Sequence, residues 1–168
     1  MSANMQPNAS VELEALPTVP IYELVTFRPS FQDGLPTDWP KGPGEARRKA
    51  DGSGEILRIA PDRWLILNPG AALVATGAAL SNWCALTDVT SKWREFRLRG
   101  TQAARLLANS VDVEELLAGR DCARTALFDC PALLCKLDAG FSVWIERSYE
   151  QAFVVAVEQV IKAQASAA

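Results

Sequence analysis

The stretch "DVTSKWREFRLRGTQAARLLANS", residues 88–110, carries the pattern that decides the fold. Within "WREFRLR", Phe96 and Leu98 alternate with three residues that share the opposite face, namely Trp93, Glu95 and Arg97. This alternation predicts a half-buried strand. A glycine ends the strand, and "TQAARLLANS" then places its apolar residues at helical spacing. A strand followed at once by an amphipathic helix indicates a layered arrangement of helices packed on a sheet.

Further helices are expected after this unit. Thr101 is a plausible N-cap for the first helix, and "VDVEELLAG" predicts a second short helical segment closed by Gly119. Near the C-terminus, Ser148 and Gln151 have the spacing of a capping box before a long helix. The expected buried stripe of that helix is formed by Phe153, Ala156, Val157, Val160 and Ile161.

Strands are predicted on both sides of the opening stretch. "EILRIA" and "RWLILN" read as a hairpin turning at "PD", and "ALTDV" reads as a further strand. Residues 122–128, 132–138 and 141–147 read as three strands joined by "DCP" and "AG", and 70–83 reads as a helix. The order from residue 55 onward is therefore β-β-α-β-β-α-β-β-β-α. It predicts an α+β fold in which helices cover one face of a single, mainly antiparallel sheet.

Residues 1–54 form a proline-rich, partly irregular arm before the domain of residues 55–168. The arm holds seven of the ten prolines, which remove ladder donors and fix backbone angles. "PIYELVTF" (20–27) predicts an edge strand that begins at Pro20. Residues 40–54 read as a loop, and the cluster Arg47-Arg48-Lys49 is better explained by a solvated loop than by contact with an acidic partner or a phosphate.

Composition and charge exclude several classes of protein. The chain has 168 residues, 49% of them hydrophobic, and a formal net charge of −3, which gives no general attraction to nucleic acid or anionic lipid. No apolar run approaches the ~18 residues that cross a bilayer, and the N-terminus lacks the pattern of a secretory signal. We expect a cytoplasmic protein, in which the four cysteines serve as small hydrophobic residues rather than in metal or redox sites.

The sequence contains no histidine, which removes the usual group that titrates near neutral pH. The cysteine spacings match no zinc pattern, and neither a dinucleotide-binding nor a phosphate-binding glycine loop is present. The carboxylate pairs, Glu114 with Glu115 and Asp129 with Asp138, have sufficient explanations as solvated or turn residues. We therefore predict no catalytic residue and no metal ligand.

Two tryptophans are candidates for a partner interface. Trp144 alternates with Phe141, Val143 and Ile145, so it should point away from the face that they bury, and Trp93 shares a face with Arg97. An exposed tryptophan beside charged residues is typical of an interface anchor. Packing of both tryptophans beneath the N-terminal arm explains the pattern equally well.

The ordered series "DVT…FRLRGTQAARLLANSVDVEELLAGRDCARTALFD" and "FSVWIERSY" resembles the half-module of folate-binding aminomethyltransferases. It is more similar still to the gamma subunit of heterotetrameric sarcosine oxidase. There "PDRWLIL", "CARTALFDCPALL" and "GFSVWIERSYEQAF" each have a counterpart. The resemblance covers roughly residues 55–162.

This resemblance implies a small, non-catalytic subunit that serves assembly and stability. The enzyme it resembles oxidises sarcosine with oxygen and passes the one-carbon unit to tetrahydrofolate. In that enzyme the large alpha and beta subunits carry NAD, FAD, FMN and the folate site, and a delta subunit completes the complex. The chain alone is then expected to bind no cofactor.

Two alternatives remain open. One is a free-standing folate-binding protein of the same superfamily. In this chain "DCP" replaces the family's glycine-rich turn, so the folate-binding aspartate is not assigned to Asp129. The other is the equivalent subunit of a dehydrogenase for another N-methylated amino acid, such as N-methylglutamate.

Overall fold

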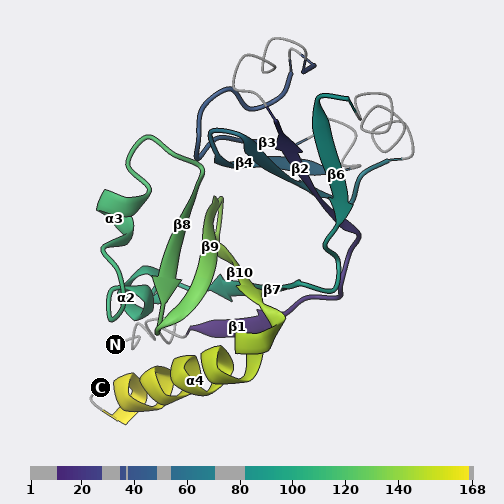
Figure 1. The fold of residues 1–168 in the computed structure, drawn as a ribbon. Helices are drawn as coiled ribbons and strands as arrows, with labels where there is room; N and C mark the ends of the chain where they lie inside the picture. Colours follow the sequence, from purple (N-terminus) through teal and green to yellow (C-terminus); the bar gives the residue numbers. More distant parts are fainter. Residues whose placement is uncertain (1–10, 28–34, 37, 49–53, 71–81, 167–168) are drawn as a thin grey trace.

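The structure is a computed structural model that describes residues 11–27, 35, 36, 38–48, 54–70 and 82–166 (Figure 1). It contains two five-stranded antiparallel sheets and a few helices, which confirms the predicted α+β class. The sequence pattern suggested one sheet rather than two. Most of the helix predicted at 70–83 lies outside the described residues. None of the described helices is long and apolar enough to span a membrane.

Sheet A has the strand order β1-β7-β10-β9-β8. Its strands are β1 (Glu12–Ala15), β7 (Trp93–Arg99), β10 (Gly140–Glu146), β9 (Cys130–Leu137) and β8 (Cys122–Leu127). Sheet B has the order β3-β4-β5-β2-β6. Its strands are β3 (Ala46–Arg48), β4 (Glu55–Ala60), β5 (Arg63–Leu67), β2 (Ile21–Thr26) and β6 (Cys84–Asp88).

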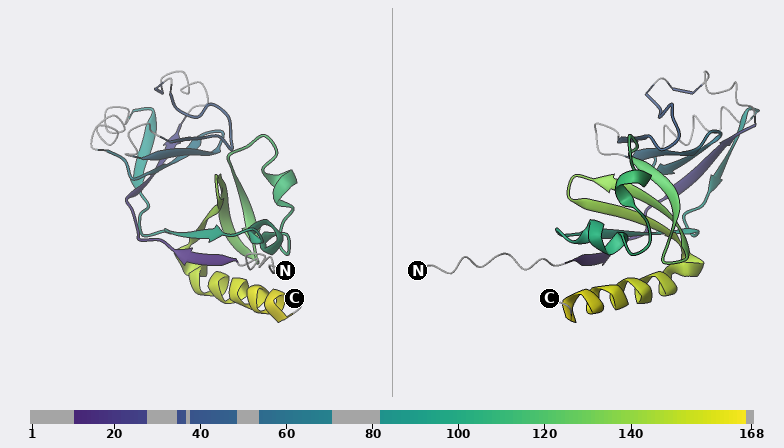
Figure 2. Two further views of the ribbon diagram at one scale, coloured as in Figure 1. Left: turned by 180° about the vertical axis from the view of Figure 1, so that it is seen from behind. Right: turned by 90° about the vertical axis from the view of Figure 1, so that its left-hand side faces the viewer.

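Sheet A has two buried faces, and side-chain alternation separates them. Phe96, Leu134 and Val143 point to a core that also contains residues of the helices. Trp93 and Trp144 point the other way, into a second core shared with sheet B. Figures 1 and 2 show the resulting layers, with α4 on one side of sheet A and sheet B on the other. A sheet covered on both sides explains why this small fold needs few helices.

The helices are α2 (Ala103–Leu107), α3 (Val113–Leu116) and α4 (Glu150–Ser166). The predicted N-cap Thr101 is wrong, because α2 is preceded by Gln102 and has no side-chain cap. The predicted capping box at Ser148 is also wrong. Arg147–Tyr149 form a 3-10 turn, and α4 begins only after it. Phe153 and Val157 of the predicted stripe are fully buried.

Residues before position 54 contribute strands to both sheets. β2 lies between β5 and β6, so the prediction of an edge strand is wrong. Pro20 precedes the strand and therefore removes no hydrogen bond from either ladder. β3 occupies part of the stretch that was expected to be a loop, and β1 pairs with β7.

The hairpins follow the predicted order, with two shifted turns, one of which is the turn between β9 and β10: it consists of Asp138 and Ala139 rather than "AG", because Gly140 already pairs with Leu137. Pro61 and Asp62 connect β4 to β5, as expected. β8 and β9 are connected by Phe128 and Asp129, rather than by "DCP", and both residues have positive φ values of 50° and 62°. Positive φ at both central residues is the backbone of a type I′ turn, which matches the twist of the strands it joins.

Candidate functional site

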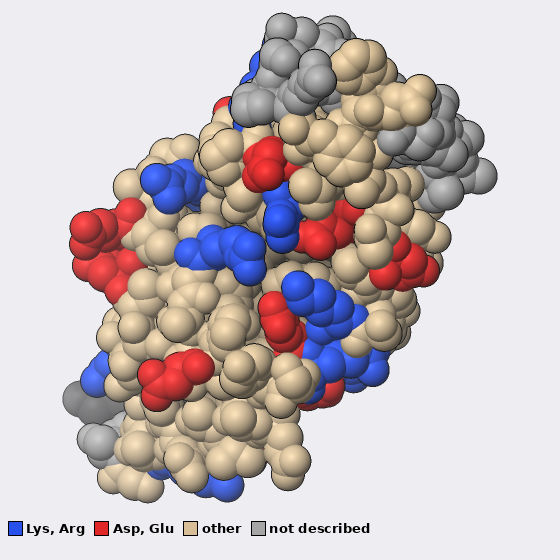
Figure 3. Space-filling model, in the orientation of Figure 1, with Lys and Arg blue, Asp and Glu red and all other residues tan. Residues whose placement is uncertain are grey.

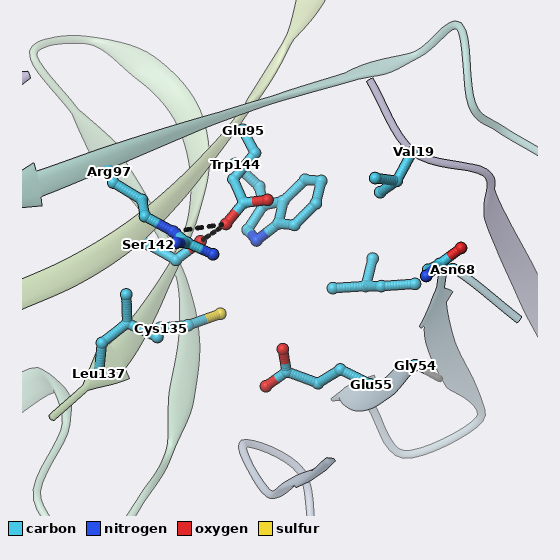
Figure 4. A pocket seen from close by; sticks show the side chains of 11 residues that line it. Val19, Gly54, Glu55, Asn68, Glu95, Arg97, Cys135, Leu137, Ser142 and Trp144 are labelled. Carbon is cyan, nitrogen blue, oxygen red and sulfur yellow. Dashed lines mark hydrogen bonds and ion pairs between the residues drawn. The ribbon is translucent and has the colours of Figure 1, made fainter. Parts of the chain in front are cut away.

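A cavity of about 250 Å³ opens between the two sheets (Figure 4). Sheet A supplies its polar wall and sheet B, with one residue of the arm, supplies the opposite wall. The lining residues are Val19, Gly54, Glu55, Leu67, Asn68, Glu95, Arg97, Cys135, Leu137, Ser142 and Trp144. We call this cavity the inter-sheet cleft.

The register of sheet A determines which side chains face the cleft. Arg97 on β7 lies opposite Ser142 on β10, which lies opposite Cys135 on β9. Cys135 in turn lies opposite Cys122 on β8. Directly opposed residues share a face of the sheet, so this row crosses four strands on the side toward sheet B.

Glu95 is the centre of the polar contacts in the cleft. The Ser142 hydroxyl donates a hydrogen bond of 2.8 Å to Glu95 Oε1. The same oxygen lies 3.7 Å from Nε of Arg97, an ion pair whose glutamate side chain is only 14% exposed. Figure 4 shows these groups beside the indole of Trp144. The wall therefore combines a carboxylate, a guanidinium, a hydroxyl and an aromatic surface.

The opposite wall comes from the start of β4 and the end of β5. Glu55 points its carboxylate toward the space, across from Cys135 (Figure 4). Gly54 comes close to the backbone at the end of β5, since a Cβ there would lie 2.7 Å from the carbonyl oxygen of Leu67. Asn68 follows β5 with a φ of 48°. These two segments together form this wall of the cleft.

A second hollow of about 540 Å³ continues from the cleft, with which it shares Glu55, Arg97 and Leu137. Charged residues of both signs line it, namely Arg47, Arg99, Lys136, Asp121 and Asp138. Figure 3 likewise shows basic and acidic side chains mixed over the visible face. Such a surface suits a ligand or partner that carries both charges.

Cys135 is the thiol that faces the cleft. A hydrogen bond with the Cys122 thiol, burial and the nearby carboxylates raise the pKa of the Cys135 thiol well above its usual value. A protonated thiol is a poor nucleophile. Among the described residues, no cluster of three or more histidine, cysteine, aspartate or glutamate side chains could hold a metal ion.

The three residues predicted for a partner interface have different surroundings. Trp93 and Trp144 are only 4% and 3% exposed, and they pack in the core between the sheets with Val19 and Ile21. The exposure expected of interface anchors is therefore absent, and the alternative explanation, packing beneath the arm, agrees with their position. Arg97 remains partly exposed and lines both hollows.

Sequence reasoning did not identify the most exposed aromatic residues of the described chain. Phe27 is 61% exposed and Trp83 is 48% exposed. The Phe27 amide donates a 2.9 Å hydrogen bond to the Trp83 carbonyl oxygen, which places the two residues side by side where β2 meets β6. No alternation pattern distinguishes them, because both lie just outside their strands.

Comparison with known proteins gives structural but not sequence matches. No family model matches the chain, and no curated protein matches it by sequence. One similar solved structure is a chain of heterotetrameric sarcosine oxidase from Corynebacterium sp. U-96 in complex with pyrrole 2-carboxylate, with a TM-score of 0.76 and 19% identity. The alignment covers 94% of this chain and 86% of that one, so the two chains are similar in length.

A second similar structure is the glycine cleavage system aminomethyltransferase T from Bartonella henselae, with a TM-score of 0.62 and 16% identity. The alignment covers 89% of this chain but 45% of the aminomethyltransferase, so this chain spans less than half of that protein. At these identities the likeness concerns the fold. The chain has the fold shared by a chain of heterotetrameric sarcosine oxidase and part of aminomethyltransferase T.

Proposed function

We propose that this chain is a small, non-catalytic subunit of a multi-subunit, flavin- and folate-dependent sarcosine oxidase. Its role is assembly and stability of the complex. The partner subunits, equivalent to alpha, beta and delta, carry FAD, FMN, NAD and tetrahydrofolate. Electron transfer and folate chemistry take place there.

One observation carries this proposal. The similar chain of heterotetrameric sarcosine oxidase matches over nearly the whole of both chains. A domain within a large catalytic subunit would leave most of that subunit unmatched, as happens with aminomethyltransferase T. The absence of histidine from the sequence also suits a subunit that leaves proton transfer to its partners.

Co-purification tests the proposal directly. The tagged chain is expressed with the products of its neighbouring reading frames, and sarcosine-dependent oxygen uptake is measured. We expect the chain to co-purify with large flavoproteins in a fixed ratio and to show no oxygen uptake alone. An isolated chain that oxidises sarcosine, or a complex that assembles and works fully without it, would overturn the proposal.

Phe27 and Trp83 provide the variants that locate the partner contact. Exposed aromatic side chains are enriched among the residues that dominate binding energy. Phe27→Ala and Trp83→Ala should each weaken co-purification at least tenfold while the isolated chain keeps its melting temperature. Val155→Ala is the matched control, because Val155 is 47% exposed on α4, outside both sheets. Equal retention of all three variants would exclude this contact.

The inter-sheet cleft favours a second candidate, a free-standing folate-binding protein. Its guanidinium and carboxylates are groups that a pterin with a glutamate tail could contact, and the adjoining hollow of about 540 Å³ adds to the space of the cleft. Titration of the isolated chain with tetrahydrofolate in a calorimeter separates the two functions. A heat of binding that the wild-type chain shows and Arg97→Ala does not would support the folate-binding function. If the wild-type chain shows no heat of binding at high ligand concentration, the folate-binding function is excluded.

The substrate of the complex is tested on the same preparation. The contacts to the substrate belong to the partner subunits in this proposal. Oxygen uptake is therefore compared for sarcosine and other N-methylated amino acids, including N-methylglutamate, with reduction of an artificial electron acceptor measured alongside. If the complex prefers another N-methylated amino acid, the proposed role in assembly stands, but sarcosine is not its substrate.

A further inference from the structure

Two of the four cysteines face each other across neighbouring strands. Cys122 on β8 lies directly opposite Cys135 on β9. A hydrogen bond with the Cys122 thiol raises the pKa of Cys135, and the Cys122 thiol also lies 4.0 Å from the carbonyl oxygen of Glu45, to which it donates. Both side chains are buried in the core between the sheets, where they are 0% and 5% exposed.

The hydrogen-bond pattern shows which type of cross-strand pair they form. The Lys136 amide donates to the Asp121 carbonyl oxygen at 2.8 Å, so the pair one step before Cys122 is hydrogen-bonded. The Cys122 amide instead donates outward to the carbonyl oxygen of Gly44 at 2.9 Å. Cys122 and Cys135 are therefore a non-hydrogen-bonded pair, whose Cα atoms are typically about 4.5 Å apart. This separation lies at the short end of the range of about 4.4–6.8 Å that a disulfide spans.

The other two cysteines lie in different cores of the fold. Cys130 belongs to β9 but points to the opposite face, into the core on the helix side of sheet A. Cys84 lies in a third core, on the outer side of sheet B. The fold therefore brings together one pair of thiols and keeps the other two apart from it and from each other.

Hollows lie on both sides of this pair. Cys135 lines the inter-sheet cleft, and its sulfur points into the open space in Figure 4. Cys122 borders a separate hollow of about 380 Å³, together with Gly44, Arg58 and Arg120. An oxidant the size of a peroxide fits either space, and it reaches the pair through Cys135, because Cys122 is fully buried.

We propose that Cys122 and Cys135 are an oxidative modification site, which a small peroxide converts into a reversible disulfide between β8 and β9. The Cys135 sulfur attacks one oxygen of hydrogen peroxide, the O–O bond breaks, and hydroxide leaves with a proton as water. The resulting sulfenic acid is attacked by the Cys122 sulfur, the S–O bond breaks, and a second water leaves. Two thiols lose two electrons and two protons in total, and the peroxide is reduced to two waters.

Two properties of the site set how this disulfide behaves. The thiolate of Cys135 is scarce, so its oxidation is slower than that of an exposed cysteine. The disulfide is reversible, because a thiol reductant returns it to two thiols by exchange. The modification is thus slow to form and reversible.

Peptide mapping of the full chain tests the proposal. The reduced protein is treated with hydrogen peroxide, then denatured, alkylated and digested with trypsin. Alkylatable thiols should fall from four to two and return to four with dithiothreitol. The linked product should join peptide 121–124 to peptide 125–136, with Cys130 alkylated and Cys135 bridged. The proposal would be overturned if all four thiols can still be alkylated after peroxide treatment, or if the bridge involves Cys130. It would also be overturned if Cys135 is over-oxidised while Cys122 remains alkylated.

Variants separate this site from oxidation in general. Cys84→Ala and Cys130→Ala keep the pair, so each should still lose two thiols. Cys135→Ala should lose none. If Cys135→Ala does not fold, the wild-type map still decides the question, and oxidation in urea shows the pairing that an unfolded chain gives. A wild-type map identical to the map in urea would also overturn the proposal.

Discussion

Truncation of Phe153 should be among the most damaging single changes in this chain. Phe153 is fully buried where α4 packs on sheet A. Its ring lies 5.3 Å from the ring of Phe96 on β7 and 6.2 Å from that of Phe128 in the β8–β9 turn. One side chain thus joins the helix, a central strand and a hairpin turn, and Phe153→Ala removes all three contacts together.

The cost can be estimated from this burial. Truncation of a buried phenylalanine to alanine typically costs about 3–5 kcal/mol, which includes the cavity that remains. A domain of this size is stable by about 5–15 kcal/mol, so the variant loses a large share of its stability. Each kcal/mol shifts the melting temperature by about 2–4 °C at this length, so a loss of about 4 kcal/mol lowers it by roughly 8–16 °C.

Urea denaturation followed by tryptophan fluorescence measures the free energy of unfolding, and a thermal scan by circular dichroism measures the melting temperature. Val155→Ala is the control on the same helix, because its side chain is 47% exposed. It should change stability by less than about 0.5 kcal/mol. If Phe153→Ala costs no more than Val155→Ala, α4 does not stabilise sheet A in the way described.

Three further predictions concern single positions. Gly140→Ala should destabilise the chain by at least ~2 kcal/mol in urea titrations, because φ is +106° and the new Cβ would overlap a backbone carbonyl oxygen. Gly119→Ala is the control: its positive φ is unfavourable for alanine but the new Cβ meets no atom, so it should destabilise the chain less. Arg58→Met should lower the free energy of unfolding in urea titrations by about 2–4 kcal/mol. Burial lowers the pKa of the Arg58 guanidinium, but its hydrogen bonds to two backbone carbonyl oxygens hold it in place, and methionine leaves both oxygens without their donor. Hydrogen bonds from backbone amides lower the pKa of Glu45. Wild type should therefore be more stable than Glu45→Gln above about pH 5, and this difference in the free energy of unfolding should disappear as the pH falls through the folded-state pKa. A difference that persists at pH 2 would contradict this assignment.

Alternation along single strands was predictable from sequence, and the partner of each face was not. The pattern correctly placed Trp93 and Trp144 opposite the apolar residues of β7 and β10. It left open whether a partner or the arm covered that face, and it did not predict a second sheet. The covering sheet includes β2, from within the proline-rich arm, paired with β5 and β6 far along the chain. Strand pairings between residues so far apart in the sequence cannot be predicted from the hydrophobic pattern of either strand.

The inter-sheet cleft was hidden for a related reason. Its polar row joins Arg97, Ser142 and Cys135 from three strands, and their alignment depends on register. Register in a hairpin is fixed by the turn. The turn assigned to "DCP" actually centres on Phe128 and Asp129, and this difference changes which residues of β8 and β9 face each other. The correct turn sets the register that places Cys122 opposite Cys135, and neither cysteine has a sequence feature that would indicate this pairing.

The polar row is the feature that packing does not explain. The space between two sheets is usually filled by apolar side chains, and the neighbouring positions of these same strands supply them. The Glu95 carboxylate, 14% exposed, and the Arg97 guanidinium, 35% exposed, lose part of their hydration there, and their mutual attraction and the Ser142 hydroxyl contribute to offsetting that cost. Under the second proposed function, these groups would contact the bound folate. The calorimetric titration of Arg97→Ala tests that role directly.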